Sequence, residues 1–284
     1  MNVSAKTKQL GIIGYPVEHS FSPKMHNFIS SLLGNDYIYS AWRVAPENVG
    51  AAIAGIRALG IRGINVTAPH KTAVMEHLDE ISEDAKRLGS VNTIVNDNGF
   101  LRGYNTDAEG FYRALKSQGI EVKNAKILVL GAGGVVKPTL MRLIWENPAE
   151  ITVLNRTKEK AVNLAKAVKA DTGFEIKTEL NLLDFDIVIN TTSAGMEPQE
   201  DALPIDAISE LGSLDFINEN TAVVDMIYNP DETLFLKEAK KRGAKTMNGL
   251  GMLIYQGLIA YELFTGTSLP SDMAEIVKRE VFGR

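Results

Sequence analysis

The stretch from Lys126 to Gly134 constrains the fold more than any other part of the chain. It is a short apolar run that ends in Gly-Ala-Gly-Gly and leads into a helical segment. A buried parallel strand, a glycine-rich turn and a helix N-terminus together are a usual way to hold a pyrophosphate. Backbone N–H groups and the positive end of the helix dipole then face the anion. A glycine-rich turn by itself is equally compatible with an ordinary tight turn.

A second apolar run, residues 150–154, ends at a basic corner that indicates which dinucleotide is bound. An NAD site tends to carry Asp or Glu about 20 residues after the glycines, where it grips the ribose 2′-hydroxyl. Here the corner carries Asn155 and Arg156, followed by Lys158 and Lys160. A single arginine is usually a solvated surface residue, but the glycine turn and the corner have the separation of a dinucleotide site. The sequence therefore predicts NADP.

Two residues depart from the usual glycine pattern. Val136 occupies the position of the third glycine and is expected to push the helix slightly off the sheet. Pro138 falls in the first helical turn, where its missing N–H has no helical acceptor to lose.

Composition narrows the class of protein. A chain of 284 residues, 45% of them apolar, is long enough for one large or two ordinary domains. A net charge of −5 without long charge runs argues against nucleic acid or a membrane surface as partner. The absence of Cys excludes disulfides, thiolate catalysis and Cys-ligated metal. The polar first ten residues lack the apolar core of a signal peptide, so a cytoplasmic protein is expected.

Apolar strand-like runs alternate with helical segments, which is typical of an α/β fold with largely parallel sheets. Ser22 is expected to cap a helix that ends at Gly34, and Asn98-Gly99 predicts a hairpin turn. We expect strands at 11–14, 37–44, 61–67, 91–95, 126–130, 150–154, 186–191 and 222–227. We expect helices at 22–33, 46–59, from Pro69 to about 88, 107–117, 250–265 and 272–281.

The order of these elements predicts two domains. Residues 107–248 form a Rossmann-type, doubly wound domain for NADP, and residues 1–106 with 249–284 form an α/β substrate domain with a mostly parallel sheet. The C-terminal helices are expected to return to the first domain, because the nucleotide domain already has its strands.

Three polar clusters lie at the ends of apolar strands in the first half of the chain. In open α/β sheets, ligands bind beyond the carboxyl ends of the strands. The clusters' hydroxyl and amide groups would suit a polyhydroxylated substrate that needs donors and acceptors. Each residue also has a plain structural explanation, such as a helix cap, a turn or a strand position. The clusters are residues 19–23, residues 65–71, and residues 90–93 together with 105–107.

Lys71 and Asp107 are the candidates for acid–base chemistry. Lys71 lies at a predicted helix start, where the helix dipole disfavours an ammonium and favours proton transfer. A nearby Asp107 would stabilise the ammonium, so the balance stays open. Taken singly, they would be a surface lysine and a capping aspartate. The four histidines, 19, 26, 70 and 77, show no paired spacing for a metal, and none is expected.

The motifs together resemble the shikimate dehydrogenase family from end to end. Any one of them is moderately specific, and their order and spacing are highly specific. The main departure is Val135-Val136-Lys137-Pro138, where the family usually has small residues. The matches are Gly14-Tyr15-Pro16, Ser20-Phe21-Ser22-Pro23, residues 65–71, Val91-Asn92-Thr93, Asn105-Thr106-Asp107, Gly131-Ala132-Gly133-Gly134, Asn155-Arg156-Thr157, residues 189–196, residues 225–230, residues 248–253 and Gln256.

The resemblance implies reversible, NADPH-dependent reduction of 3-dehydroshikimate to shikimate by a monomer or homodimer. It implies Lys71 as the acid–base residue and Asp107 as its partner. Implied shikimate contacts are Ser20, Ser22, Thr67, Lys71, Asn92, Asp107, Tyr228 and Gln256, with Asn65 close by. Implied cofactor contacts are Gly131, Ala132, Gly133, Gly134, Val135, Asn155, Arg156, Thr157, Lys158, Lys160, Thr192, Met226, Gly249 and Glu83.

Two alternatives stay open. A quinate/shikimate dehydrogenase that uses NAD is the nearest, but the basic corner has no acidic residue for a ribose diol. A non-catalytic, NADP-binding regulator of the same fold is the second. Such a sensor would need neither Lys71 nor Asp107, and the chain carries both.

Overall fold

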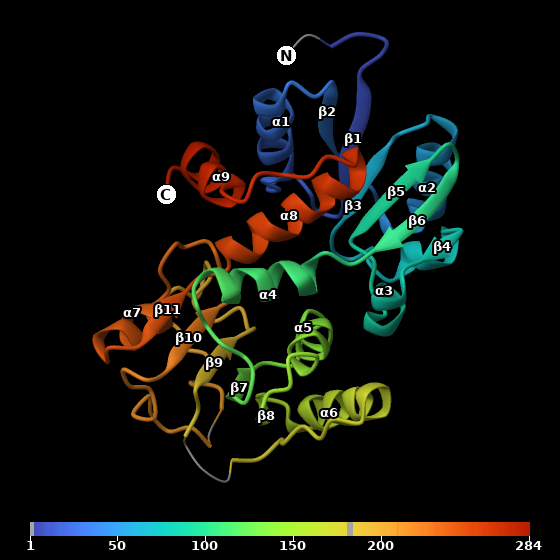
Figure 1. The fold of residues 1–284 in the computed structure, drawn as a ribbon. Helices are drawn as coiled ribbons and strands as arrows, with labels where there is room; N and C mark the ends of the chain where they lie inside the picture. Colours follow the sequence, from blue (N-terminus) through green and yellow to red (C-terminus); the bar gives the residue numbers. More distant parts are fainter. Residues whose placement is uncertain (1–2, 181–183, 209) are drawn as a thin grey trace. The chain divides into compact units, whose positions relative to one another are not determined.

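A computed structural model describes residues 3–180, 184–208 and 210–284 of the chain (Figure 1). The chain divides into two compact units. The first unit comprises Met1–Gly110 and Ile254–Arg284, and the second comprises Phe111–Leu253. The α/β class and the two-part arrangement predicted from the sequence are confirmed.

The first unit is built on a six-stranded sheet of order β2-β1-β3-β5-β6-β4. Strands β2, β1 and β3 are parallel, whereas β5 runs antiparallel to β3 and forms a hairpin with β6. The hairpin turn is the predicted Asn98-Gly99, with φ of 55° and 93°, as a tight two-residue turn requires. The strands are β1 (Lys8–Gly14), β2 (Tyr37–Arg43), β3 (Gly63–Val66), β4 (Glu80–Ile81), β5 (Thr93–Asp97) and β6 (Phe100–Tyr104).

Helices cover both faces of this sheet because the strand residues alternate between two apolar cores. Ile13 packs in one core with residues of α2 and α3, whereas Leu10 and Ile12 pack in another with Phe264 of α8. The helical elements here are α1 (Ser22–Leu33), η1 (Pro46–Asn48), α2 (Val49–Ala58), η2 (Ala73–His77), α3 (Glu83–Leu88), the last turns of α8 (Leu250–Thr265) and α9 (Met273–Phe282).

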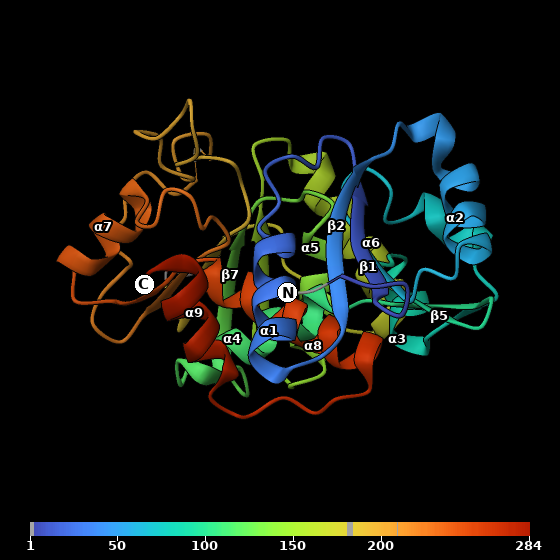
Figure 2. The same cartoon turned by 90° about the horizontal axis from the view of Figure 1, so that it is seen from above.

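The C-terminal helices return to the first unit, as predicted. Helix α9 lies beside α1, the red and blue helices of Figure 2. The ring of Phe282 lies 5.3 Å from that of Phe21, and Lys24 Nζ donates a hydrogen bond to the carbonyl of Val281.

The second unit is a doubly wound domain with a five-stranded parallel sheet of order β11-β10-β9-β7-β8. Lys177 adds a single parallel bridge beside Thr152 of β8, which extends the order to that of a Rossmann sheet. The strands are β7 (Lys126–Leu130), β8 (Glu150–Leu154), β9 (Ile187–Asn190), β10 (Ala222–Asp225) and β11 (Lys245–Met247). The helices are α4 (Asp107–Ser117), which begins in the first unit, α5 (Val136–Ile144), α6 (Lys158–Thr172) and α7 (Leu234–Lys241).

Two local predictions were wrong. Ser22 does not cap α1: Phe21 holds the N-cap position without a side-chain hydrogen bond, and Ser22 is the first helical residue. The helix expected from Pro69 to Leu88 is three pieces, namely η2, the two-residue strand β4 and α3. Asp79 breaks the segment because its Oδ2 accepts hydrogen bonds from Leu101 N and Arg57 Nη1, which holds it against the β6 strand.

Within the described residues, no helix has the length and apolar character needed to cross a membrane.

Candidate functional site

The predicted acid–base pair forms in the first unit. Lys71 Nζ donates a hydrogen bond of 2.7 Å to Asp107 Oδ2, and the side chains are 33% and 16% exposed. Lys71 lies in the turn after β3, where its carbonyl accepts a hydrogen bond from Val91 N, and Asp107 is the first residue of α4. An ammonium and a carboxylate thus meet at the ends of two elements, partly open to solvent.

The Asp107 carboxylate is available to Lys71 because another residue caps α4. Asn105 Oδ1 accepts hydrogen bonds from Asp107 N and Ala108 N, at 3.1 and 3.3 Å. Asn105 Nδ2 in turn donates to the carbonyl of Ser90, which ties the helix start to the segment before β5. The alternative that Asp107 is only a helix cap is therefore not what the structure shows.

Two buried asparagines lie beside the pair. Asn92 Oδ1 accepts a hydrogen bond of 2.8 Å from Thr106 N, and its Nδ2 donates to Thr106 Oγ1 at 3.0 Å. Asn65 Nδ2 donates to Thr93 Oγ1 and to the carbonyl of Asn92, at 3.1 and 3.3 Å. Asn65 and Asn92 are 5% and 3% exposed, so both amides are fixed by protein partners.

The hydroxyl residues predicted to bind substrate belong to the same unit. Ser20 Oγ accepts a hydrogen bond from Ser22 N at 3.2 Å, and Ser22 is buried at the start of α1. Thr67 follows β3, and a Cβ on Gly14 would lie 2.3 Å from its methyl group. Gly14 therefore makes room for the Thr67 side chain.

Gln256 is carried by α8, which passes very close to α4. A Cβ on Gly110 would lie only 2.6 Å from the backbone nitrogen of Gln256. Only glycine allows this approach, and the approach sets the position of Gln256 relative to the first turn of α4, which holds Asp107 and Gly110.

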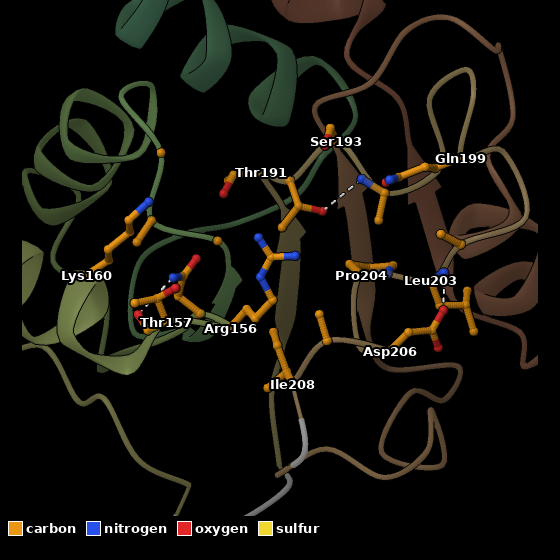
Figure 3. A pocket seen from close by; sticks show the side chains of 18 residues that line it. Arg156, Thr157, Lys160, Thr191, Ser193, Gln199, Leu203, Pro204, Asp206 and Ile208 are labelled. Atoms are coloured by element: carbon orange, nitrogen blue, oxygen red, sulfur yellow. Dashed lines mark hydrogen bonds between the residues drawn. The ribbon is translucent and has the colours of Figure 1, made fainter.

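The second unit contains a pocket of about 430 Å³ at the carboxyl ends of β7, β8 and β9 (Figure 3). Strands β8 and β9 flank β7, so the pocket lies where the strand order reverses, the usual ligand site of a doubly wound sheet. The lining residues predicted from the sequence are Gly131, Ala132, Gly133, Asn155, Arg156, Thr157, Lys160 and Thr192.

Gly131 forms the base of this pocket. Its φ is +113°, and a Cβ there would lie 2.4 Å from Thr191 Oγ1. Glycine is required on both counts. The Thr191 hydroxyl donates to the carbonyl of Leu130 at 2.8 Å and so joins the ends of β7 and β9.

The basic corner supplies the positive charge of the pocket. Arg156 and Lys160 extend their side chains into the same space in Figure 3. Asn155 Nδ2 donates to the carbonyl of Thr157 at 2.9 Å, which holds the corner in shape at the N-terminus of α6. Two cations and a helix N-terminus suit a phosphate monoester.

Lys158, in contrast, is turned to another partner. Its Nζ lies 2.6 Å from Glu210 Oε1, and the same carboxylate raises the pKa of Lys158 through a hydrogen bond and charge attraction. Lys158 does not line the pocket. Glu83 is likewise paired on α3, where it accepts a hydrogen bond of 2.8 Å from Lys86 Nζ.

The remaining predicted contacts lie around the end of β10. A Cβ on Gly249 would lie 2.1 Å from the carbonyl oxygen of Met226, so this position needs glycine. Met226 and Tyr228, just after β10, are half-buried.

At the start of α5, Gly134 and Val135 are exposed. Val136 is fully buried there.

Asp225, the last residue of β10, holds the loop after this strand in place by hydrogen bonds. Its carboxylate accepts hydrogen bonds from Ile227 N, Thr233 Oγ1 and Asn190 Nδ2, at 3.0, 2.7 and 3.1 Å. Burial raises the pKa of Asp225, and these three donors oppose that shift. Asn190 Oδ1 accepts from Thr192 N and Oγ1, so one buried cluster supports both the β9 and β10 loops.

Sequence reasoning missed two groups of residues. One wall of the pocket comes from the irregular segment after β9, which has no periodic pattern to reveal it. Tyr39 of β2, whose hydroxyl donates to Asn65 Oδ1 at 2.7 Å, was not predicted either, because this contact depends on the strand order β2-β1-β3. The pocket residues in question are Gln199, Ala202, Leu203, Pro204, Asp206, Ala207 and Ile208. Thr191, Ser193 and Ala194 also line the pocket; they lie in the matched stretch 189–196 but were not predicted as contacts.

The part of the chain that the structure describes contains no cluster of His, Cys, Asp or Glu able to hold a metal ion.

Comparison with known proteins agrees with this geometry. Residues 12–94 match the model of the shikimate dehydrogenase substrate binding domain, and residues 113–199 match that of shikimate/quinate 5-dehydrogenase. Residues 249–281 match the shikimate 5′-dehydrogenase C-terminal domain.

Individual relatives cover nearly the whole chain. A NADP(+) shikimate dehydrogenase of Geobacillus kaustophilus is 47% identical over 91% of this chain and 93% of its own. A crystal structure of a shikimate dehydrogenase in complex with NADP+ has a TM-score of 0.89 at 42% identity, covering 99% of this chain and 97% of that one. The Thermus thermophilus enzyme in complex with NADP(H) and shikimate has a TM-score of 0.83 at 36% identity, covering 96% and 99%. The chain belongs to the shikimate dehydrogenase family.

Proposed function

We propose that this protein catalyses the reversible, NADPH-dependent reduction of 3-dehydroshikimate to shikimate, a step of aromatic amino-acid biosynthesis. The observation that carries the proposal is the 2.7 Å hydrogen bond between Lys71 Nζ and Asp107 Oδ2. Membership of the family supports it, because curated relatives at 46–47% identity are NADP(+) shikimate dehydrogenases.

Lys71 is the proton donor of the reduction. Negative charge develops on the C3 oxygen of the substrate as the carbonyl is reduced, and the Lys71 ammonium stabilises that charge before it delivers the proton. Asp107 holds the ammonium in place and keeps it aimed. Bound NADPH supplies the hydride. In the direction of shikimate oxidation, Lys71 takes the hydroxyl proton back.

The substrate hydroxyls and carboxylate meet the polar residues of the first unit. Their hydroxyl and amide groups offer both donors and acceptors. The set is Ser20, Ser22, Asn65, Thr67, Lys71, Asn92, Asp107 and Gln256. Tyr228 is assigned to the substrate on the family resemblance. We assign residues 1–106 with 249–284 to the substrate domain and residues 107–248 to the cofactor domain.

The donor groups of the second unit fit NADP. Gly131 to Gly134 with Val135 form the turn for the pyrophosphate, and Arg156 with Lys160 meets the 2′-phosphate. Asn155, Thr157 and Thr192 complete that side of the pocket. Lys158, Glu83, Met226 and Gly249 are assigned to the cofactor on the family resemblance. We further propose a cytoplasmic protein that works as a monomer or homodimer.

The test is an absorbance assay of the reduced nicotinamide with purified protein. NADPH and NADH are each supplied with dehydroshikimate, and NADP and NAD are each supplied with shikimate and with quinate. The proposal expects the highest kcat/KM for the NADP pair with shikimate. A higher kcat/KM for NAD with quinate would assign the protein to the alternative activity. Binding of NADPH without any turnover would indicate a regulator.

A further inference from the structure

Tyr39 is a buried tyrosine that hydrogen-bonds to a residue of the predicted substrate site. It lies on β2, it is 3% exposed, and its hydroxyl donates a hydrogen bond of 2.7 Å to Asn65 Oδ1. Burial raises the pKa of Tyr39 well above its ordinary value. The phenol is therefore un-ionised and donates to a residue that we assign to the substrate.

The Tyr39 hydroxyl is the first member of a buried chain of hydrogen bonds. Because Asn65 Oδ1 accepts from Tyr39, the Asn65 amide must present its Nδ2 to Thr93 Oγ1, at 3.1 Å. The Thr93 hydroxyl then donates to Asn92 Oδ1 at 3.0 Å, and Asn92 also holds Thr106, the residue before Asp107.

The orientation of each asparagine in this chain is set by its own partners, and for Asn92 the deciding partner is the backbone N–H of Thr106, which donates to Oδ1 at 2.8 Å. An asparagine amide has a donor end and an acceptor end of nearly the same shape, so its orientation is set by its neighbours. Tyr39 is the donor to Asn65 Oδ1, and the carbonyl of Asn92 accepts from Asn65 Nδ2, so these two partners together set the orientation of Asn65. The members that follow, Asn65, Asn92, Thr93 and Thr106, are all 5% exposed or less.

Tyr39 is itself held at its backbone and at its ring. Asn27 of α1 makes a paired contact with its backbone, since Asn27 Nδ2 donates to Tyr39 O and Tyr39 N donates to Asn27 Oδ1, both at 2.9 Å. The His26 ring stacks on the Tyr39 ring with centroids 4.3 Å apart and an angle of 8° between the planes. The hydroxyl is thus a fixed reference point rather than a freely rotating group.

We propose that Tyr39 is a positioning residue for the substrate: its hydroxyl donates to Asn65 Oδ1 and so holds the Asn65 amide with its Nδ2 towards Thr93 Oγ1 and the carbonyl of Asn92. Tyr39 does not touch the reacting atoms. This inference rests on the proposed function, since it assigns a support to the same site. Loss of the hydroxyl leaves a buried acceptor, Asn65 Oδ1, without its donor, and the amide is then held from its Nδ2 end alone.

The test compares two buried tyrosines. Tyr39→Phe removes the hydroxyl and keeps the ring. Tyr261→Phe is the matched control, because the Tyr261 hydroxyl is also fully buried with two partners, Ser30 Oγ at 3.2 Å and Asn35 Nδ2 at 2.9 Å. Its ring also faces His26, at 5.9 Å. Neither partner of Tyr261 belongs to the proposed substrate site.

Tyr39→Phe is expected to raise the KM for shikimate by about tenfold, the worth of one good buried hydrogen bond, with kcat and the KM for NADP within about twofold of wild type. Tyr261→Phe is expected to lower the melting temperature similarly and to leave the KM for shikimate unchanged. KM does not depend on the folded fraction of the enzyme, so a partial loss of stability does not imitate the effect.

A double-variant cycle locates the effect. If Tyr39 acts through Asn65, then Tyr39→Phe should have little further effect on KM in an Asn65→Ala background. Equal KM values for both tyrosine variants, or fully additive effects in the cycle, would overturn the inference. Absence of shikimate turnover in the wild-type protein would instead overturn the proposed function, so the two failures are distinguishable.

Discussion

Replacing His26 by phenylalanine is expected to make the first unit more resistant to acid. The His26 side chain is fully buried on α1, and within the described residues neither ring nitrogen has a hydrogen-bond partner. Its neighbours are the rings of Tyr39 on β2 and of Tyr261 and Phe264 on α8, at 4.3, 5.9 and 6.0 Å. The only titratable groups among these neighbours are phenols, which are neutral near and below pH 7.

The magnitude follows from the environment. Burial lowers the pKa of His26 from 6.5 to about 3, since a charged imidazolium would lie in an apolar site without a partner. The unfolded chain takes up a proton below pH 6.5 and the folded chain does not. The free energy of unfolding therefore has its full value above pH 6.5 and falls as the pH drops below 6.5. By linkage, His26 lowers this free energy by about 0.2 kcal/mol near pH 7 and by about 2 kcal/mol near pH 5.

The assay uses the placement of the two tryptophans. Trp42 lies in the first unit and Trp145 in the second, so in a Trp145→Phe background the fluorescence reports the first unit alone. Urea unfolding is followed at about pH 7 and about pH 5 for His26 and for His26→Phe. Phenylalanine keeps a ring against Tyr39 and cannot titrate, and all other groups cancel in the comparison. The stability difference between the two proteins should grow by about 2 kcal/mol on acidification. If the stability difference between the two proteins is the same at both pH values, protonated His26 is accommodated in the folded state, and the reasoning is wrong.

Three further substitutions test the site and the helix crossing. Lys71→Ala is expected to lower kcat by about 10²–10⁴ with little change in KM for shikimate, as loss of a placed proton donor does; wild-type turnover would contradict the role. Arg156→Ala should raise the KM for NADPH far more than that for NADH, and an equal rise for both would remove the 2′-phosphate contact. Gly110→Ala should cost about 1–3 kcal/mol in urea unfolding, because the new methyl group meets the Gln256 backbone, whereas Gly55→Ala on α2, with nothing within 4 Å, should be neutral or stabilising.

Where local chemistry decides the structure, the sequence was sufficient. The helix predicted at 107–117 is α4, residue for residue, because Asn105 and Asp107 mark its start and Gly119 follows its end. The hairpin at Asn98-Gly99 is confirmed for the same reason, since few residues accept two successive positive φ values. The apolar runs beside the glycine turn have the length and composition of buried parallel strands, so the strands there were predicted.

Where tertiary contacts decide, sequence reasoning was insufficient. The segment after Pro69 has helical composition, yet Asp79 holds it against β6 and splits it. Ser22 has the chemistry of a cap, but α1 begins one residue earlier than a Ser22 cap requires, with Phe21 at the N-cap. Lys158 belongs to the basic corner by sequence and pairs with Glu210 in the structure, a partner 52 residues away along the chain that no local pattern indicates. Which of the predicted residues contact ligands remains a prediction.

The β5–β6 hairpin has a consequence for how this site is maintained. Asn92 and Asp107 lie just outside the two open ends of the ribbon, and Thr93 pairs with Tyr104 at its base. The turn at Asn98-Gly99 lies at the far end, about 15 Å away at the usual rise per residue. A slip of one residue in that turn would reverse which side every ribbon residue faces. The exposed Asn98-Gly99 turn, remote from the predicted ligand contacts, thus governs whether the Asp107 carboxylate meets the Lys71 ammonium. Insertions in this turn should be poorly tolerated, although the turn includes none of the predicted site residues.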